Sequence, residues 1–178
     1  MRWNGHRVTA LIAGLDMAHR IEQHFRGAVT DAAPEAATVA VDRLIDVCTF
    51  LRDEPELRFE FLSSLTAVDR LEYFEVAYHL TSIRLNQRTA IKVRADGREN
   101  PKVPSVTSVW PGATLQEREA YDLMGIVFEG HPDMRRVFLW DGFAGHPLRK
   151  DYLTLPGGQM PGLERFPGEP GEPLGGRG

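Results

Sequence analysis

The chain has 178 residues, 42% of them hydrophobic and 26% charged, which is enough for one globular domain with a core and some extensions. Its formal net charge of −4 argues against a nucleic-acid binder. The single cysteine, Cys48, excludes internal disulfide bonds and a four-thiolate iron–sulfur site within this chain. The sequence has neither an apolar run of roughly 20 residues nor a signal-peptide layout, so we expect a soluble protein of a reducing compartment.

Two amphipathic helices are predicted in the N-terminal part of the chain. Apolar residues at helical spacing indicate one helix over about 7–26 and another over 41–51, ending before Pro55. Between them, Pro34 excludes a continuous helix and residues 37–40 suggest a short strand. Cys48 falls on the apolar stripe of the second helix, so we expect a small core residue rather than a reactive thiol.

A meander of antiparallel strands is predicted next. Apolar and polar residues alternate over 57–61, continue in an extended stretch over 65–68, and alternate again over 73–81 and 88–94. Residues 69–72 have the composition of a turn. One face of this sheet is apolar, and the two preceding helices have apolar stripes of matching size. We therefore expect the helices to cover that face in an α+β layer.

A third helix is expected to begin at a capping box, in which Thr114 and Glu117 satisfy the first amide groups, and to end at a left-handed Gly125. Arg118 and Asp122 are four residues apart, a spacing at which they can pair on its surface for about a few tenths of a kcal/mol. The predicted fold class is thus α+β: an antiparallel or mixed sheet packed by two helices, then a short helix and a long extended C-terminal docking arm. The predicted domains are the sheet domain over 1–100, the helix with its arm over 101–155 and a Pro/Gly-rich tail over 156–178.

The stretch after Gly125 has no helical or strand period, yet it contains two Gly-His-Pro triplets among charged and aromatic residues. An irregular segment of this length leaves backbone N–H and C=O groups without partners if it stands alone. Arginine and aromatic residues are also the usual composition of protein-interface hot spots. We therefore expect this segment to dock on another protein.

The sequence offers little for catalysis, and we assign no catalytic, cofactor-binding or metal-binding residue. No glycine-rich nucleotide loop and no nucleophile elbow is found. His131 and His146 lack the ligand spacing typical of zinc, which favours a structural hydrogen-bonding role over a metal site. His79, on the polar side of a strand, is expected to be a surface residue. A small enzyme that uses His131 or His146 as acid or base stays an alternative, and a nucleic-acid binder is disfavoured by the charge.

Two motifs carry a resemblance to a known family. The run EREAYDLMGIVFEGHPDMRRVF, followed by GHPLRKDY, resembles the signature of the 30-kDa subunit family, the C-type subunits, of the proton-pumping NADH:quinone oxidoreductase (respiratory complex I). Upstream, FEFLSSLTAVDR, FEVAYHL and ENPKVPSVTSVWPGA are similar to the sheet domain of that family, so the resemblance covers about 37–155. The stretch Trp140-Asp141-Gly142-Phe143 departs from the family pattern, and so does Leu153-Thr154.

The resemblance implies a structural subunit that carries no cofactor, while FMN and the iron–sulfur clusters reside in partner subunits. It implies packing against the large quinone-site subunit of type D and near the iron–sulfur subunit of type B. It also implies a peripheral place on the cytoplasmic side of the cell membrane, reached only through the complex. The alternative is a homologous subunit of an energy-converting hydrogenase or a deazaflavin-dependent dehydrogenase.

The residues expected to form or brace the interface, with arginines as partners for a neighbour's carboxylates or carbonyls, are Glu117, Arg118, Tyr121, Asp122, His131, Asp133, Arg135, Arg136, His146, Arg149, Lys150, Asp151 and Tyr152.

Overall fold

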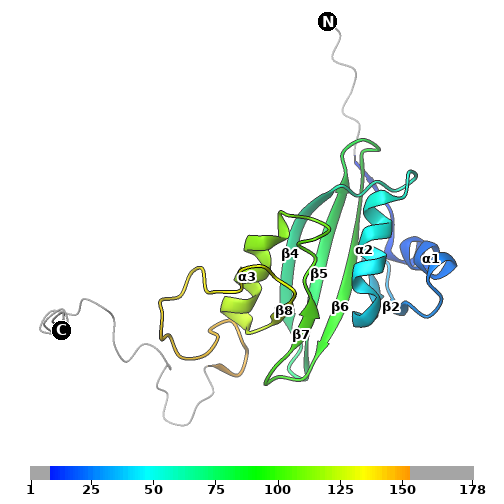
Figure 1. Cartoon of the computed structure of the whole chain (residues 1–178). Helices are drawn as coiled ribbons and strands as arrows, with labels where there is room; N and C mark the ends of the chain where they lie inside the picture. The colour runs from blue at the N-terminus through cyan, green and yellow to red at the C-terminus, as the bar shows by residue number, and fades with distance from the viewer. Residues whose placement is uncertain (1–8, 153–178) are drawn as a thin grey trace, which may run out of the picture.

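A computed structural model describes residues 9–152, and the predictions for the tail over 156–178 lie outside the described residues. The predicted α+β class is confirmed (Figure 1). The elements in chain order are β1 (Ala10–Leu11), α1 (Gly14–His24), β2 (Val29–Ala32), β3 (Ala37–Val39), η1 (Val41–Arg43), α2 (Leu44–Asp53), β4 (Phe61–Asp69), β5 (Tyr73–Ser82), β6 (Gln87–Asp96), β7 (Lys102–Pro104), α3 (Ala113–Met124) and β8 (Val127–Glu129).

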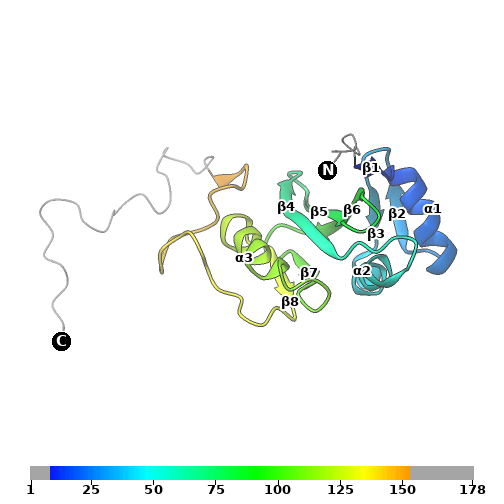
Figure 2. The same cartoon turned by 90° about the horizontal axis from the view of Figure 1, so that it is seen from above.

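The six-stranded sheet is mixed and has the order β2-β3-β6-β5-β4, with β1 pairing beside β3 on β6. The meander β4-β5-β6 is antiparallel, as predicted, whereas β3 and β1 run parallel to β6. A separate pair of parallel strands, β7 and β8, brackets α3 in the sequence. Seen from above, α2 and α3 lie on the same side of the sheet (Figure 2).

The covered face of the sheet is the one that the alternation predicted. Phe74, Val76, Tyr78 and Leu80 of β5 are buried, and His79 between them is exposed. Apolar residues of α1 and α2, Cys48 among them, belong to the same core. Burial raises the pKa of the Cys48 thiol, so this residue is the inert core cysteine that the sequence indicated.

The first helix is shorter than predicted. It covers Gly14–His24 rather than 7–26, because Ala10 and Ile12 donate backbone hydrogen bonds to the carbonyls of Asn86 and Arg88 and so draw this segment to the edge of β6. Gly14 lies so close to the β2–β3 turn that a Cβ there would come within 2.2 Å of the Ala33 carbonyl oxygen. The pairing with β6 outweighs the local helical pattern.

The strand predicted over 57–61 is wrong, because β4 begins only at Phe61. Arg58 adopts a positive φ of 46°, and the backbone N–H groups of Arg58 and Phe59 donate to the carbonyls of Glu54 and Leu51. These bonds continue the end of α2 as a turn. Leu57 and Phe59 are buried by that turn, whereas Phe61 stays 51% exposed.

The capping box predicted for the third helix is also wrong. Gly112 is the N-cap of α3 and makes no side-chain cap, while the Thr114 hydroxyl donates to the Pro111 carbonyl. The Glu117 carboxylate points into the protein instead of back to the helix start. The predicted end is confirmed, because Gly125 is left-handed with φ 74°.

Candidate functional site

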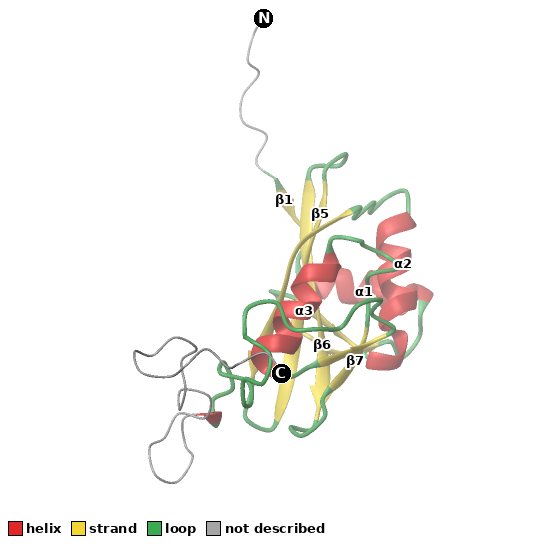
Figure 3. Ribbon diagram, turned by 60° about the vertical axis from the view of Figure 1, so that its left-hand side comes forward, coloured by secondary structure: helices red, strands yellow, loops and turns green. Residues whose placement is uncertain are grey.

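The segment after β8, residues 130–152, is called the arm below. It contains no strand and no α-helix, and its loops return to α3 (Figure 3). Several groups of contacts hold it. Each of them uses residues from the two motifs that the sequence singled out.

The central contact is the carboxylate of Asp122, whose side chain is fully buried in the last turns of α3. Its Oδ2 accepts the backbone N–H groups of Val137, Phe138 and Leu139 at 3.0, 2.8 and 3.0 Å, and its Oδ1 accepts from Arg136 at 3.2 Å. Burial by itself opposes ionisation, but these donors outweigh it and lower the pKa of Asp122. A single carboxylate thus fixes a turn of the arm on α3.

Two arginines bind carbonyls of the arm. Arg118 donates to the carbonyls of Arg135 and Arg136 at 3.0 and 3.1 Å, and Arg136 donates to the carbonyl of Gly145 at 3.2 Å. The predicted surface pair between Arg118 and Asp122 is therefore wrong, because each side chain has a partner in the arm. These groups satisfy the backbone that the sequence reasoning expected a second protein to satisfy.

The second Gly-His-Pro triplet closes on the end of α3. His146 Nδ1 lies 2.9 Å from the Asp122 carbonyl oxygen, and Arg149 donates to the carbonyls of Met124 and Arg98 at 2.7 and 2.8 Å. A Cβ on Gly125 would meet the His146 and Arg149 side chains at 2.6 and 2.4 Å. Burial lowers the pKa of both His146 and Arg149. Gly125 therefore serves as the helix cap and as the seat of the arm.

The far end of the arm is held at the β4–β5 turn. Arg98 binds Asp69 at 2.8 Å and Asp151 at 2.8 Å, and the backbone N–H of Lys150 donates to Asp69 at 2.9 Å. The hydrogen bonds from Arg98 hold the pKa of Asp69 far below its usual range. Neither Asp69 nor Arg98 was among the site residues predicted from the sequence. Asp69 could have been found as a carboxylate that begins a turn, whereas nothing local marks Arg98.

Glu117, also one of the predicted interface residues, points into the protein and away from the arm. Its carboxylate, with no exposed surface, accepts the Ser105 hydroxyl and the Val106 N–H, both at 2.7 Å. Burial without a cationic partner among the described residues raises its pKa to about 7, against the two hydrogen bonds that lower it. The buried Tyr78 hydroxyl, which has no hydrogen-bond partner in the described part of the chain, and the Cys48 thiol lie in the same region.

The remaining predicted residues lie around these contacts. His131 Nε2 is 3.0 Å from the Thr114 carbonyl oxygen, and Asp133 pairs with Arg135 at 2.9 Å. The Tyr121 ring contacts His146 edge-on, and the Tyr152 hydroxyl donates to the Ala144 carbonyl. The structure brings all thirteen predicted residues to α3 and the arm. It does not test whether they touch a partner, so that part stays a prediction.

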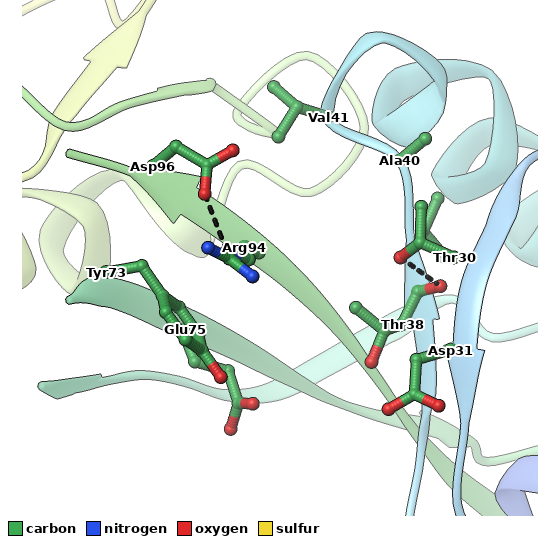
Figure 4. Close-up of a pocket in the computed structure, with 10 residues that line it drawn as sticks. Thr30, Asp31, Thr38, Ala40, Val41, Tyr73, Glu75, Arg94 and Asp96 are labelled. Atoms are coloured by element: carbon green, nitrogen blue, oxygen red, sulfur yellow. Dashed lines mark hydrogen bonds and ion pairs between the residues drawn. The ribbon is translucent and has the colours of Figure 1, made fainter. Parts of the chain in front are cut away.

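A hollow of about 620 Å³ lies away from the arm, on the open face of the sheet beside the β2–β3 hairpin (Figure 4). Arg94 binds Asp96 at 2.6 Å and places its guanidinium 3.9 Å from the centre of the Tyr73 ring. Glu75 is paired with Lys92 at 3.2 Å. Because these charges bind one another, we assign no ligand to the hollow.

The described residues lack the side-chain groupings of a metal site and the helices of a membrane anchor. Within residues 9–152, no three His, Cys, Asp or Glu side chains are grouped in a way that could hold a metal ion. In the same range, none of the helices has the length and apolar character needed to cross a bilayer.

Comparison with known proteins gives consistent results. The family described as "Respiratory-chain NADH dehydrogenase, 30 Kd subunit" matches residues 37–156. A protein from Roseiflexus sp. (strain RS-1), named as the C-type subunit of NADH-quinone oxidoreductase, is 50% identical over 116 residues, which span 64% of this chain and 66% of the relative. The protein of the same name from Moorella thermoacetica is 46% identical over 127 residues, 70% of this chain and 84% of the relative.

A solved structure is also similar. It is a chain from the membrane-bound sulfane sulfur reductase, described as an archaeal respiratory membrane complex. The TM-score is 0.63 at 26% identity, and the match covers 80% of this chain and 86% of the other.

Proposed function

Because the chain belongs to the respiratory-chain NADH dehydrogenase 30-kDa subunit family, we propose that it is a structural subunit of NADH:quinone oxidoreductase that carries no cofactor of its own. In this role it helps to assemble the module that reduces quinone. Electrons pass from NADH through FMN and iron–sulfur clusters held by partner subunits, and their transfer is coupled to proton translocation. The observation that carries the proposal is the family match over residues 37–156.

The chemistry of the site supports a structural role. The residues best suited to acid–base work, His131 and His146, each hydrogen-bond a backbone carbonyl of α3. The arginines Arg118 and Arg149 bind backbone carbonyls as well. Side chains used in this way hold a backbone in place. Their arrangement favours a rigid docking arm over an active site.

The proposed partners are the large quinone-site subunit of type D and the iron–sulfur subunit of type B, together with the other subunits of the complex. The chain reaches the cytoplasmic side of the membrane as a peripheral part of that complex. No nucleic acid is among the proposed partners, in keeping with the net charge of −4.

A second candidate is a homologous subunit of another membrane-bound respiratory complex, such as an energy-converting hydrogenase or a deazaflavin-dependent dehydrogenase. The similarity to a chain of the sulfane sulfur reductase complex favours keeping it, because a related fold occurs in a complex named for a different reaction. The two candidates differ in the electron donor and in the neighbouring subunits, not in what this chain does.

The experiment that tests the proposal is purification of the complex through an affinity tag on this chain, with the co-purifying chains identified by mass. We expect type D and type B subunits and NADH:quinone reductase activity in one assembly, and no flavin or iron in the chain purified alone. Hydrogenase-type subunits without an NADH-binding flavin subunit would favour the second candidate. Turnover by the isolated chain would refute a structural role.

A further inference from the structure

The charged motif residues of α3 and of the arm are largely engaged with the chain's own groups. Asp122 is paired with Arg136, and Asp133 with Arg135. Asp151 is paired with Arg98 at the far end. A side chain that already holds such bonds has to lose them before it can bind a neighbour, and that loss offsets the new interaction. Strong docking contacts are therefore to be sought elsewhere on the arm.

Apolar side chains stand out from this braced backbone. Phe138 is 63% exposed, and Val137 and Leu148 are 39% and 55% exposed. The backbone that carries them is held in place, because the N–H of Phe138 is bonded to Asp122 and that of Leu148 to the Leu123 carbonyl at 3.1 Å. Both attachments are made at the last turn of α3. Holding a large apolar side chain rigidly in water gains nothing for the isolated chain.

The other aromatic residues of the arm behave differently. Phe143 packs edge-on against Trp140 at 4.8 Å between ring centres and stacks on Tyr152 at 6.2 Å. These rings stabilise the arm itself. Leu148, in contrast, borders a groove of about 170 Å³ between α3 and the edge of β4, whose lining includes Leu123 and Met124. The arm thus presents Phe138 as a projection and Leu148 as the rim of an apolar groove.

We propose that Val137, Phe138 and Leu148 are the surface by which the arm docks on its partner subunit, and that the charged motif residues act as internal braces that shape it. This inference rests on the proposed function. The partner is a protein surface with an apolar pocket for Phe138. Near this residue Asp122 is paired with Arg136 and Asp133 with Arg135, so the arm offers a charged partner few unpaired charges. Rigid presentation also removes much of the ordering cost of association.

The test is a competition between two copies of the full chain in one cell. Wild-type and variant copies, distinguishable by peptide mass, are expressed at equal levels, and the complex is purified through a tag on the large partner subunit. The variant-to-wild-type ratio in the complex is compared with the ratio in the cell. The variant is Phe138→Ala. The matched control is Phe61→Ala, which removes a phenylalanine of similar exposure from the start of β4.

We expect Phe138→Ala to be depleted about tenfold or more, as for an aromatic anchor buried in an interface, and Phe61→Ala to enter at a ratio near one. The isolated Phe138→Ala chain should keep the slow amide exchange of residues 137–139, which shows that the arm is still braced. A brace variant, Asp122→Asn, should lose that protection and also be depleted.

Three outcomes would speak against these ideas, and they can be told apart. If Phe138→Ala enters as well as wild type while Asp122→Asn is excluded, the arm docks through other residues and the inference is wrong. If Phe61→Ala is depleted to the same extent, the effect is not specific to the arm, and the inference is again overturned. If the wild-type chain itself does not co-purify with the partner, the proposed function fails and the inference falls with it.

Discussion

Replacing Asp122 by Asn tests whether one carboxylate holds the arm on α3. Four hydrogen bonds end on the Asp122 carboxylate, from the backbone N–H groups of Val137, Phe138 and Leu139 and from the Arg136 guanidinium. The substitution keeps the size of the side chain but removes its charge. One of the two acceptor oxygens becomes an NH₂ group, which cannot accept a hydrogen bond from the donors that face it.

The expected magnitude follows from the character of these bonds. A hydrogen bond to a charged group contributes about 1.5–3 kcal/mol, and breaking a buried ion pair by removing one partner costs about 3–5 kcal/mol. The three amides share one oxygen and Arg136 is 22% exposed, so the contributions of the four hydrogen bonds do not add. We therefore expect the substitution to cost about 3 kcal/mol in total. The cost falls on local opening of the arm, because no part of the sheet is bonded to this carboxylate.

Amide hydrogen exchange resolved by residue is the suitable assay. Local destabilisation by about 3 kcal/mol speeds the exchange of the three amides by about a hundredfold, while amides of β5 keep their rates. The matched control is Asp133→Asn, whose side chain is 52% exposed and pairs mainly with Arg135. Unchanged exchange at residues 137–139 in Asp122→Asn would refute the assignment of this carboxylate as the central brace.

Two further predictions concern stability. Glu117→Gln should remove a pH dependence of the free energy of unfolding. In the folded protein the pKa of Glu117 is about 7, above the ordinary 4.5, so this carboxyl contributes stability that is complete below pH 4.5 and is lost as the pH rises to 7. The whole contribution is about 3 kcal/mol. Chemical denaturation of the wild type and the variant at pH 5 and pH 8 measures this difference. The depressed pKa values of Asp69 and Asp122 act only in more acidic solution, and the depressed pKa of His146 acts in both proteins alike. An equal decline in the variant would contradict the assignment. Gly125→Ala should lower the melting temperature more than Gly130→Ala. Both glycines have a positive φ, so an alanine at either position costs about 1–2 kcal/mol of backbone strain. Only the Cβ at position 125 would also collide with the arm. Equal losses in thermal melts would mean that the arm yields at Gly125 without cost.

The sequence determined the elements whose periodicity and burial agree. The alternation in β5 marks its buried face directly, because neighbouring strands and helices can cover only one side of such a pattern. The stripe that contains Cys48 predicted α2 for the same reason. Gly125 was predicted as a left-handed cap, since this backbone conformation is a local property of glycine. The resemblance to the 30-kDa subunit family was likewise visible in the sequence motifs of α3 and the arm without knowledge of the fold.

Tertiary structure decided the elements whose partners are distant in the chain. Residues 57–60 have a strand pattern but form no strand, because the amides of Leu57, Arg58 and Phe59 bond to the end of α2. Thr114 and Glu117 have a capping-box spacing, yet Ser105 and Val106, brought close by β7, bind the carboxylate more directly.

The role of the arm's charges was decided in the same way. Spacing placed Arg118 and Asp122 on one helix face, but only the returning arm supplied the carbonyls and amides that they bind. No local pattern marks Arg98 as a site residue, because its partners Asp69 and Asp151 are 29 and 53 residues away in the chain. Local sequence specifies propensity and pattern, whereas hydrogen-bond partners for a backbone without repeating structure are set only when the chain has folded.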